Sequence, residues 1–344
     1  MVQLLDEVNK MKQISFVVPC YNSESYMEHC INSLLINKKD IEVIIIDDGS
    51  KDKTGKIADN YKRKYPDIVK VVHQENGGHG EGINQGLKKA TGRYFKVVDS
   101  DDWLDEKCLK TLLKKIKDIN TDLIVTNYVY TYTDGRENQS INFSNVFDEE
   151  KVLSWDDIHR FKTKQYLMLH SLIFKKEMLD KADIVLPKHV FYEDNLFVYM
   201  ALRHTSSIYY MNLDLYHYFI GREDQSVQEP QLIKRSSHQV LVSTQVGTLY
   251  NIKDIKNKKH YRVMKRHLSL YITLAIVFSR LSKSKEGEKQ YKDMLKEIKA
   301  KNIKVYRLIR NPFTMAGWAS IPGKSGRWTV IKGYRLAHKL VNFN

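Results

Sequence analysis

Cysteine is scarce in this sequence. The 344 residues include only three cysteines, at Cys20, Cys30 and Cys108. An odd number of cysteines without CxxC spacing excludes a disulfide framework and a cysteine-based zinc site. We therefore expect a protein that works in a reducing compartment.

Long hydrophobic runs and a leader pattern are also missing. The longest apolar run, LSLYITLAIVF at 268–278, is shorter than the roughly 20 residues that a membrane-spanning helix needs. Asp6 and Glu7 stand where a secretory signal would carry its apolar segment. These absences predict a cytoplasmic protein that is soluble, or peripheral at the inner face of the cell membrane.

Acidic residues are absent from the C-terminal part, residues 301–344. Residues 251–344 hold 23 Lys and Arg against 5 Asp and Glu, whereas the first 250 residues hold 33 against 36. The net charge of +15 is therefore a property of the C-terminal region and not of the whole chain. This asymmetry predicts an anionic surface or polymer as the neighbour of that region.

The first 127 residues alternate short apolar runs with stretches of helical spacing. The runs are rich in Val and Ile, as is typical of strands buried on both faces, and they lie at 14–19, 41–47, 68–72, 94–98 and 121–127. The helical stretches lie at 24–36, 53–65, 80–90 and 105–118. The alternation predicts an α/β fold in which helices cover both faces of a parallel sheet.

The pattern changes after residue 128. The segment YVYTYTDGRENQSINF (128–143) predicts a β-hairpin that turns at Asp134-Gly135. Residues 230–300 read as basic helices, and the segment QEPQL (228–232) marks the expected boundary between two domains, 1–228 and 229–344.

Three polar segments, PCYN, DDGS and DSDD, each follow a predicted strand. Ligands of such folds bind beyond the carboxyl ends of the strands, so we expect the three segments to meet at one edge. The closely spaced Asp99, Asp101 and Asp102 repel one another unless a cation is present. A solvated acidic turn that caps the next helix is the simpler explanation, and a Mg²⁺ or Mn²⁺ site is the functional one.

The other two segments have simple structural explanations as well. In IEVIIIDDGSKDKTG, Asp48 or Ser50 could cap the following helix, and a carboxylate there could equally accept the ring N–H of a uracil. The glycines of ENGGHGEGINQG (75–86) allow close backbone approach. This segment is not a dinucleotide fingerprint, because it follows the third strand rather than the first.

The segments VVPCYN, IIIDDGSKDKT and ENGGHGEGINQGLKKATGRYFKVVDSDDWL, in this order, closely resemble family 2 glycosyltransferases with the GT-A fold. The resemblance is strong over 13–128 and extends more loosely to about 226. It implies a GT-A (Rossmann-like) mixed, mainly parallel sheet flanked by helices in residues 1–228. A basic, mainly helical extension would follow in 229–344.

The resemblance also implies roles for residues that match the family's motifs. Tyr21 and Pro19 would form the nucleobase pocket, and Asp48 would accept the N–H of the base. Asp99 would contact the ribose region, and Asp101 would hold a Mn²⁺ or Mg²⁺ that bridges the donor's diphosphate.

Further residues follow from the same resemblance. Asn84 matches the asparagine of the family's glycine-containing segment, although Gly82 and Ile83 replace its usual Ala and Arg. In VFYEDNLFVYMAL (190–202), Asp194 would be the catalytic base and Glu193 its positioning neighbour. These two acids could also simply begin a helix and favour its dipole.

Two basic features remain open. Arg222 suits a contact with the diphosphate, and a solvent-facing loop arginine is the alternative. In RWTVIKGYRLAHKLVNF (327–343), Lys332, Arg335 and Lys339 share one helical face, nearly opposite an apolar stripe. That stripe could pack on its own protein, or the helix could lie on an anionic membrane surface.

Together with the observations above, the resemblance implies an inverting, metal-dependent hexosyl- or N-acetylhexosaminyltransferase. It would move a sugar from a UDP-sugar to a glycan, lipid-linked or wall-polymer acceptor in surface polysaccharide biosynthesis. The alternatives are a non-catalytic nucleotide-sugar-binding subunit and a scaffold that binds membranes or polyanions. We do not expect nucleic acid as a partner, because no recognised binding module is present.

Overall fold

The computed structural model describes residues 12–163, 165–221, 225 and 228–341. The chain forms two compact units, one of Met1–Val190 with Met200–Gly221 and the other of Phe191–Tyr199 with Arg222–Asn344. The predicted boundary between residues 228 and 229 stays a prediction. That prediction did not include Phe191–Tyr199 in the C-terminal unit.

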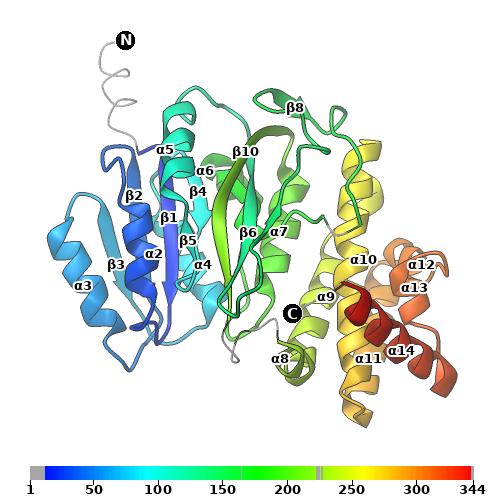
Figure 1. Cartoon of the computed structure of the whole chain (residues 1–344). Coiled ribbons are helices and arrows are strands. Elements are labelled where there is room, and N and C mark those ends of the chain that lie inside the picture. Colours follow the sequence, from blue (N-terminus) through cyan, green and yellow to red (C-terminus); the bar gives the residue numbers. More distant parts are fainter. Residues whose placement is uncertain (1–11, 164, 222–224, 226–227, 342–344) are drawn as a thin grey trace. The chain divides into compact units, whose positions relative to one another are not determined.

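A mixed sheet forms the centre of the first unit (Figure 1). Its order is β3-β2-β1-β4-β9-β6-β10-β5, with β7 beside β6 and β8 beside β10. Neighbours are parallel from β3 to β4 and between β6 and β10, whereas β9 is antiparallel to both of its neighbours. The strands are β1 (Ile14–Cys20), β2 (Ile41–Asp47), β3 (Val69–His73), β4 (Tyr94–Val97), β5 (Trp103–Leu104), β6 (Leu123–Tyr132), β7 (Gln139–Ile141), β8 (Val152–Ser154), β9 (Leu172–Lys175) and β10 (Ser207–Ile220).

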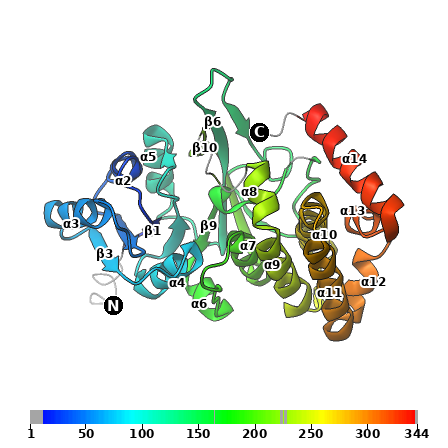
Figure 2. The ribbon, with the colours of Figure 1, turned by 90° about the horizontal axis from the view of Figure 1, so that it is seen from below.

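Helices cover both faces of this sheet, as Figure 2 shows, with α2 and α5 on one face and α4 and α6 on the other. The prediction of a mixed, mainly parallel sheet flanked by helices is therefore confirmed. The helices that begin in this unit are α2 (Met27–Leu34), α3 (Thr54–Lys64), α4 (His79–Lys89), α5 (Glu106–Lys115), α6 (Lys176–Ala182) and the short 3₁₀ helix η1 (Leu169–Ser171).

Close packing fixes α4 against the centre of the sheet. Every residue of β1 and β2 is buried, as expected for strands covered on both faces. A Cβ at Gly86 of α4 would lie 2.3 Å from Val17 Cγ1, so only glycine allows this helix to approach β1 so closely. The segment that begins α4 is therefore held firmly at the carboxyl edge of the sheet.

The predicted hairpin is also confirmed. Strand β6 pairs antiparallel with β7, with Tyr128 opposite Ile141. Gly135 has a φ of 86° in the turn between them, a conformation that favours glycine.

The second unit is helical and is built around α10, which contacts α8, α9, α11, α13 and α14. Arg280 of α10 is fully buried, and its guanidinium donates to the carbonyls of Ala319 (2.8 Å) and Ile321 (2.7 Å). Within the described residues, no helix has both the length and the apolar character needed to cross a membrane. The remaining helices are α7 (Glu193–His204), α8 (Glu229–Lys234), α9 (Ser236–Leu249), α10 (Lys258–Leu281), α11 (Lys285–Lys301), α12 (Ile303–Ile309), α13 (Met315–Ala319), α14 (Gly323–Val341) and the 3₁₀ helix η2 (Ile252–Asp254).

Candidate active site

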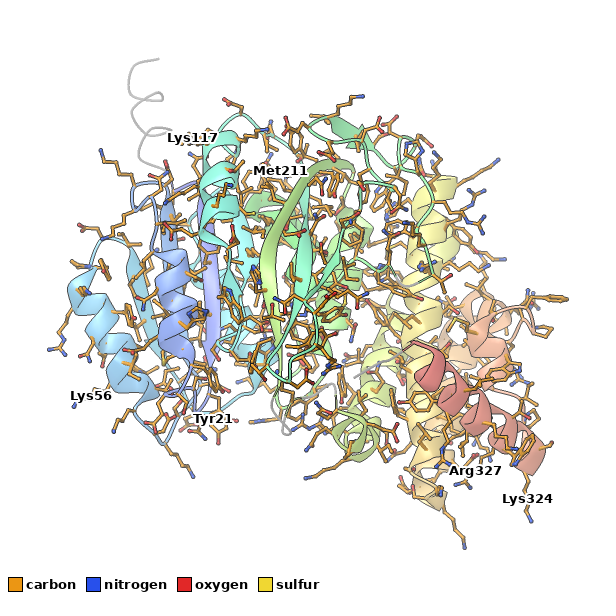
Figure 3. All side chains as sticks on the ribbon, in the orientation of Figure 1. Tyr21, Lys56, Lys117, Met211, Lys324 and Arg327 are labelled. Atoms are coloured by element: carbon orange, nitrogen blue, oxygen red, sulfur yellow. The ribbon has the colours of Figure 1, made fainter. Side chains whose placement is uncertain are left out.

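The segments that follow β1, β2 and β4 are joined by hydrogen bonds at the carboxyl edge of the sheet. Ser23 after β1 donates its backbone N–H to Thr54 Oγ1 at 2.7 Å, and its hydroxyl lies 2.9 Å from that of Ser100. Pro19 is buried near the end of β1. Tyr21 is 49% exposed at this edge, where Figure 3 labels it. The expectation that the three polar segments meet is confirmed.

Asp48 builds the glycine-rich turn after β3. It is buried, and one carboxylate oxygen accepts from Gly77 N (2.7 Å) and Gln74 Nε2 (2.6 Å). The other oxygen accepts from Gly78 N at 2.8 Å. A carboxylate has about four acceptor positions, so one is left for a ligand.

His79, the first residue of α4, lies against the acidic turn. Its Nε2 is 3.0 Å from an oxygen of Asp99. Burial raises the pKa of Asp99, whereas the hydrogen bond from His79 and the charge of His79 lower it. The net pKa of Asp99 lies below its usual value. Asp99 is therefore ionised at neutral pH.

Asp99, Asp102 and His170 form a cluster that could hold a metal ion, because one ligand atom of each lies within 4.8 Å of the others. Asp102 is fully buried and accepts from Tyr216 Oη (2.5 Å) and from Phe219 N (2.8 Å). Burial raises the pKa of Asp102 well above its usual value, and the charges of Asp101 and Asp99 raise it further. Ionisation of Asp102 therefore needs a positive charge nearby, which a metal ion would supply.

The imidazole of His170 is in the form that binds metals. Burial lowers the pKa of His170 to about 4, so the ring is neutral at pH 7. The ring packs against two tyrosines, with its centroid 4.8 Å from that of Tyr216 and 4.5 Å from that of Tyr218. Beneath it, Lys96 donates to the carbonyl of His170 at 2.7 Å, and burial lowers the pKa of Lys96 to about 7.

The donor set of two carboxylates and one imidazole fits a divalent ion. Carboxylate oxygens suit Mg²⁺ and Mn²⁺, and an imidazole nitrogen favours a transition metal such as Mn²⁺ over Mg²⁺. The cluster contains Asp99 and Asp102 but not Asp101, so Asp101 as the metal ligand and Asp99 at the ribose stay predictions. His170 was not predicted, because it lies about 70 residues from the acidic turn and no motif marks it.

Asn84 has a structural role that its motif did not indicate. It is buried, and its side-chain amide donates to Glu81 Oε2 (3.0 Å) and to the carbonyl of Leu186 (2.9 Å). Its oxygen accepts from Leu186 N at 2.9 Å. One amide hydrogen and the oxygen of Asn84 thus hold the segment around Leu186 on α4, and the other hydrogen is bound to Glu81 of the same helix. A contact of Asn84 with the donor stays a prediction.

Glu193 and Asp194 occupy the first turn of α7, within the segment Phe191–Tyr199 that groups with the second unit. Glu193 is buried and Asp194 is half-buried. Acidic residues here are favoured by the helix dipole, which is the structural explanation considered above. Their catalytic roles stay predictions. Arg222 lies outside the described residues.

The chain is similar to known glycosyltransferases. The model of glycosyl transferase family 2 matches residues 15–178. The putative glycosyltransferase EpsH of Bacillus subtilis is 30% identical over 219 residues, which cover 60% of each chain. The poly(ribitol-phosphate) beta-N-acetylglucosaminyltransferase TarS of Staphylococcus aureus is 27% identical over 235 residues, covering 67% of this chain and 39% of TarS.

The crystal structure of S. aureus TarS 1-349 in complex with UDP-GlcNAc superposes with a TM-score of 0.67 at 23% identity. The alignment covers 94% of this chain and 92% of that one. The predicted GT-A fold is thereby confirmed. This chain spans about 60% of the length of EpsH and less than half of TarS.

Proposed function

Because residues 15–178 belong to glycosyl transferase family 2, we propose that the chain is an inverting, metal-dependent glycosyltransferase. It moves a hexosyl or N-acetylhexosaminyl group from a UDP-sugar to a glycan, lipid-linked or wall-polymer acceptor. The observation that carries this proposal is the cluster that Asp99 and Asp102, in the acidic turn after β4, form with His170.

In this proposal the nucleotide lies along the carboxyl edge of β1, β2 and β4. Tyr21 stacks on the base beside Pro19, and the remaining acceptor position of Asp48 takes its N–H. Asp99, Asp102 and His170 would hold a Mn²⁺ or Mg²⁺ ion together with Asp101, the ligand that the resemblance implies. When bound, the ion would supply positive charge that stabilises the departing diphosphate.

Asp194 is the proposed base. It takes the proton of the acceptor hydroxyl while the oxygen of that hydroxyl attacks the anomeric carbon. Attack opposite the departing diphosphate inverts the anomeric centre without a covalent intermediate. Arg222, Glu193 and Asn84 keep the supporting roles that the resemblance implies. The relatives named for poly(ribitol-phosphate) favour a phosphate-containing wall polymer as the acceptor.

Donor hydrolysis tests the proposal without a known acceptor. We expect one sugar from a panel of UDP-sugars to release UDP with Mn²⁺, and EDTA to abolish this release. Asp101→Ala should reduce the release, and Asp118→Ala is the control, because Asp118 is an exposed acid outside the cluster. If no UDP-sugar gave metal-dependent UDP release or binding, a non-catalytic subunit would replace this proposal.

The proposal includes contact between the C-terminal region and an anionic membrane surface. On α14, Val330 is buried and the ring of Tyr334 packs on Phe278, so the apolar stripe covers its own protein. The outer face nevertheless carries Trp328 and Leu336, each 60% exposed. The exposed cations Lys324, Lys332 and Arg335 surround these two side chains. Exposed Trp and Leu among cations are typical of helices that lie on anionic bilayers.

Vesicle binding tests this contact. Trp328→Ala combined with Leu336→Ala should weaken binding to phosphatidylglycerol vesicles by at least roughly 30-fold, because both side chains would leave the bilayer interface. Val152→Ala is the control, since Val152 is 67% exposed and lies in the first unit. Equal co-sedimentation of all three proteins would rule the contact out.

A further inference from the structure

One face of α11 carries a row of lysines. Lys285, Lys289, Lys292 and Lys296 follow a spacing of four, three and four residues, which places them on a single helical face. The opposite face is buried, and its side chains include Tyr291, Met294 and Ile298. Packing of that face therefore keeps the four lysines together on the exposed side of the helix.

This lysine row lines a hollow with a volume of about 400 Å³. Lys283, in the turn between α10 and α11, and Arg327 of α14 complete the positive side of the hollow. Figure 3 labels Arg327 together with Lys324 at the N-terminal end of α14. Three segments of the second unit thus direct cations to one place.

The acids of the hollow are too few to balance these cations. Glu288 lies 3.4 Å from Lys292, and Asp293 lies 3.0 Å from Lys296. Among the described residues, no carboxylate is paired with the other four cations, Lys283, Lys285, Lys289 and Arg327. Like charges this close together on a helix cost stability, and an anionic ligand would relieve that cost.

We propose that this hollow binds the phosphate groups of a phosphodiester-linked polymer. The four unpaired cations give charge-assisted hydrogen bonds to phosphate oxygens, and Arg327 can bind one phosphate through two of its nitrogens. Lys285 and Lys296 are separated by 11 helical steps, or about 16 Å along the axis at 1.5 Å per residue, and this length suits a chain of phosphates better than a single ion.

The hollow would give the proposed enzyme a second binding site for its acceptor, in addition to the site at the acidic cluster of the first unit. Identification of the bound polymer with the sugar acceptor rests on the proposed function, whereas the binding itself does not. Such a site would retain the polymer between successive sugar transfers.

The test uses the full chain and fluorescently labelled poly(glycerol phosphate), with binding followed by fluorescence anisotropy. The triple variant Lys285→Gln, Lys289→Gln, Arg327→Gln should bind the polymer roughly 100-fold more weakly, because three cations that contact phosphate are removed. Each factor of ten in Kd corresponds to about 1.4 kcal/mol of binding free energy. The affinity of the variant should also depend less steeply on salt concentration. Its thermal stability without polymer should be equal or higher, because repulsion is removed.

The control variant Lys256→Gln, Lys258→Gln removes exposed cations near the opposite end of α10 and should bind like the wild type. Metal-dependent UDP release without acceptor should be unchanged in every variant, so failure of the proposed function would be recognised separately. Equal loss in the triple variant and the control would overturn the proposal in favour of diffuse charge attraction. Loss of binding to phosphatidylglycerol vesicles alone, with polymer binding intact, would overturn it in favour of a lipid surface.

Discussion

Replacing Asp102 with asparagine is expected to lower metal-dependent UDP release by at least roughly 100-fold, since a charged metal ligand is removed. Asp102 is fully buried beside Asp99 and His170. Asparagine has nearly the same shape, but it can accept from only one of the two donors, Tyr216 Oη and Phe219 N. The unpaired donor costs about 1–3 kcal/mol, which offsets the gain from removing a buried charge.

The same variant can be followed without activity. Burial and the neighbouring acids raise the pKa of Asp102 in the native state, so the native chain holds a proton that the unfolded chain releases near pH 4. Without metal, this carboxyl makes the free energy of unfolding fall as the pH rises from there toward the native pKa. Mn²⁺ should therefore raise the melting temperature of the wild type more at neutral than at mildly acidic pH.

Asp102→Asn should lose most of this shift, and the control Asp118→Asn should keep it, because Asp118 is exposed and distant from the cluster in sequence. A variant at Asp102 that retained both the Mn²⁺ shift and UDP release would remove Asp102 from the metal site.

The first unit was largely predictable because its strands are continuous apolar runs. The runs at 14–19, 41–47 and 68–72 became β1, β2 and β3, with an error of one residue at most at each end. Helices predicted at 53–65 and 80–90 became α3 and α4. Long-range pairing was not predictable in this way: β9 inserts antiparallel between β4 and β6, and no local pattern specifies that partner.

In the candidate site, too, local sequence patterns predicted some residues, whereas long-range strand pairing brings in the others. The sequence indicated that Tyr21, Asp48 and the acidic turn would meet, because each directly follows a strand. It could not indicate His170, which reaches the acids only through the placement of β9. It also could not show which acids of the turn face inward. Asp102 does so because Tyr216 and Phe219 of β10, remote in sequence, donate to it.

Replacing Asp48 with asparagine is expected to weaken UDP binding by roughly 100-fold and to raise KM more than it lowers kcat. The two oxygens of Asp48 accept from Gly77 N, Gly78 N and the side chain of Gln74. Asparagine would direct an N–H₂ group at one of these donors and leave it unsatisfied. Each lost hydrogen bond to a charged acceptor is worth about 1.5–3 kcal/mol, so one or two of them give the expected change.

The effect should arise from the turn as much as from the carboxylate itself. Gly78, which precedes α4, has a φ of 84°, and His79 follows it to reach Asp99. When the turn loosens, His79 no longer holds Asp99 in place, so the pKa of Asp99 should rise toward its usual value. Glu75→Gln is the matched control, because Glu75 is exposed in the same turn and loses the same charge. Calorimetry of UDP binding separates the two variants, and equal affinities would show that Asp48 does not organise the nucleotide site.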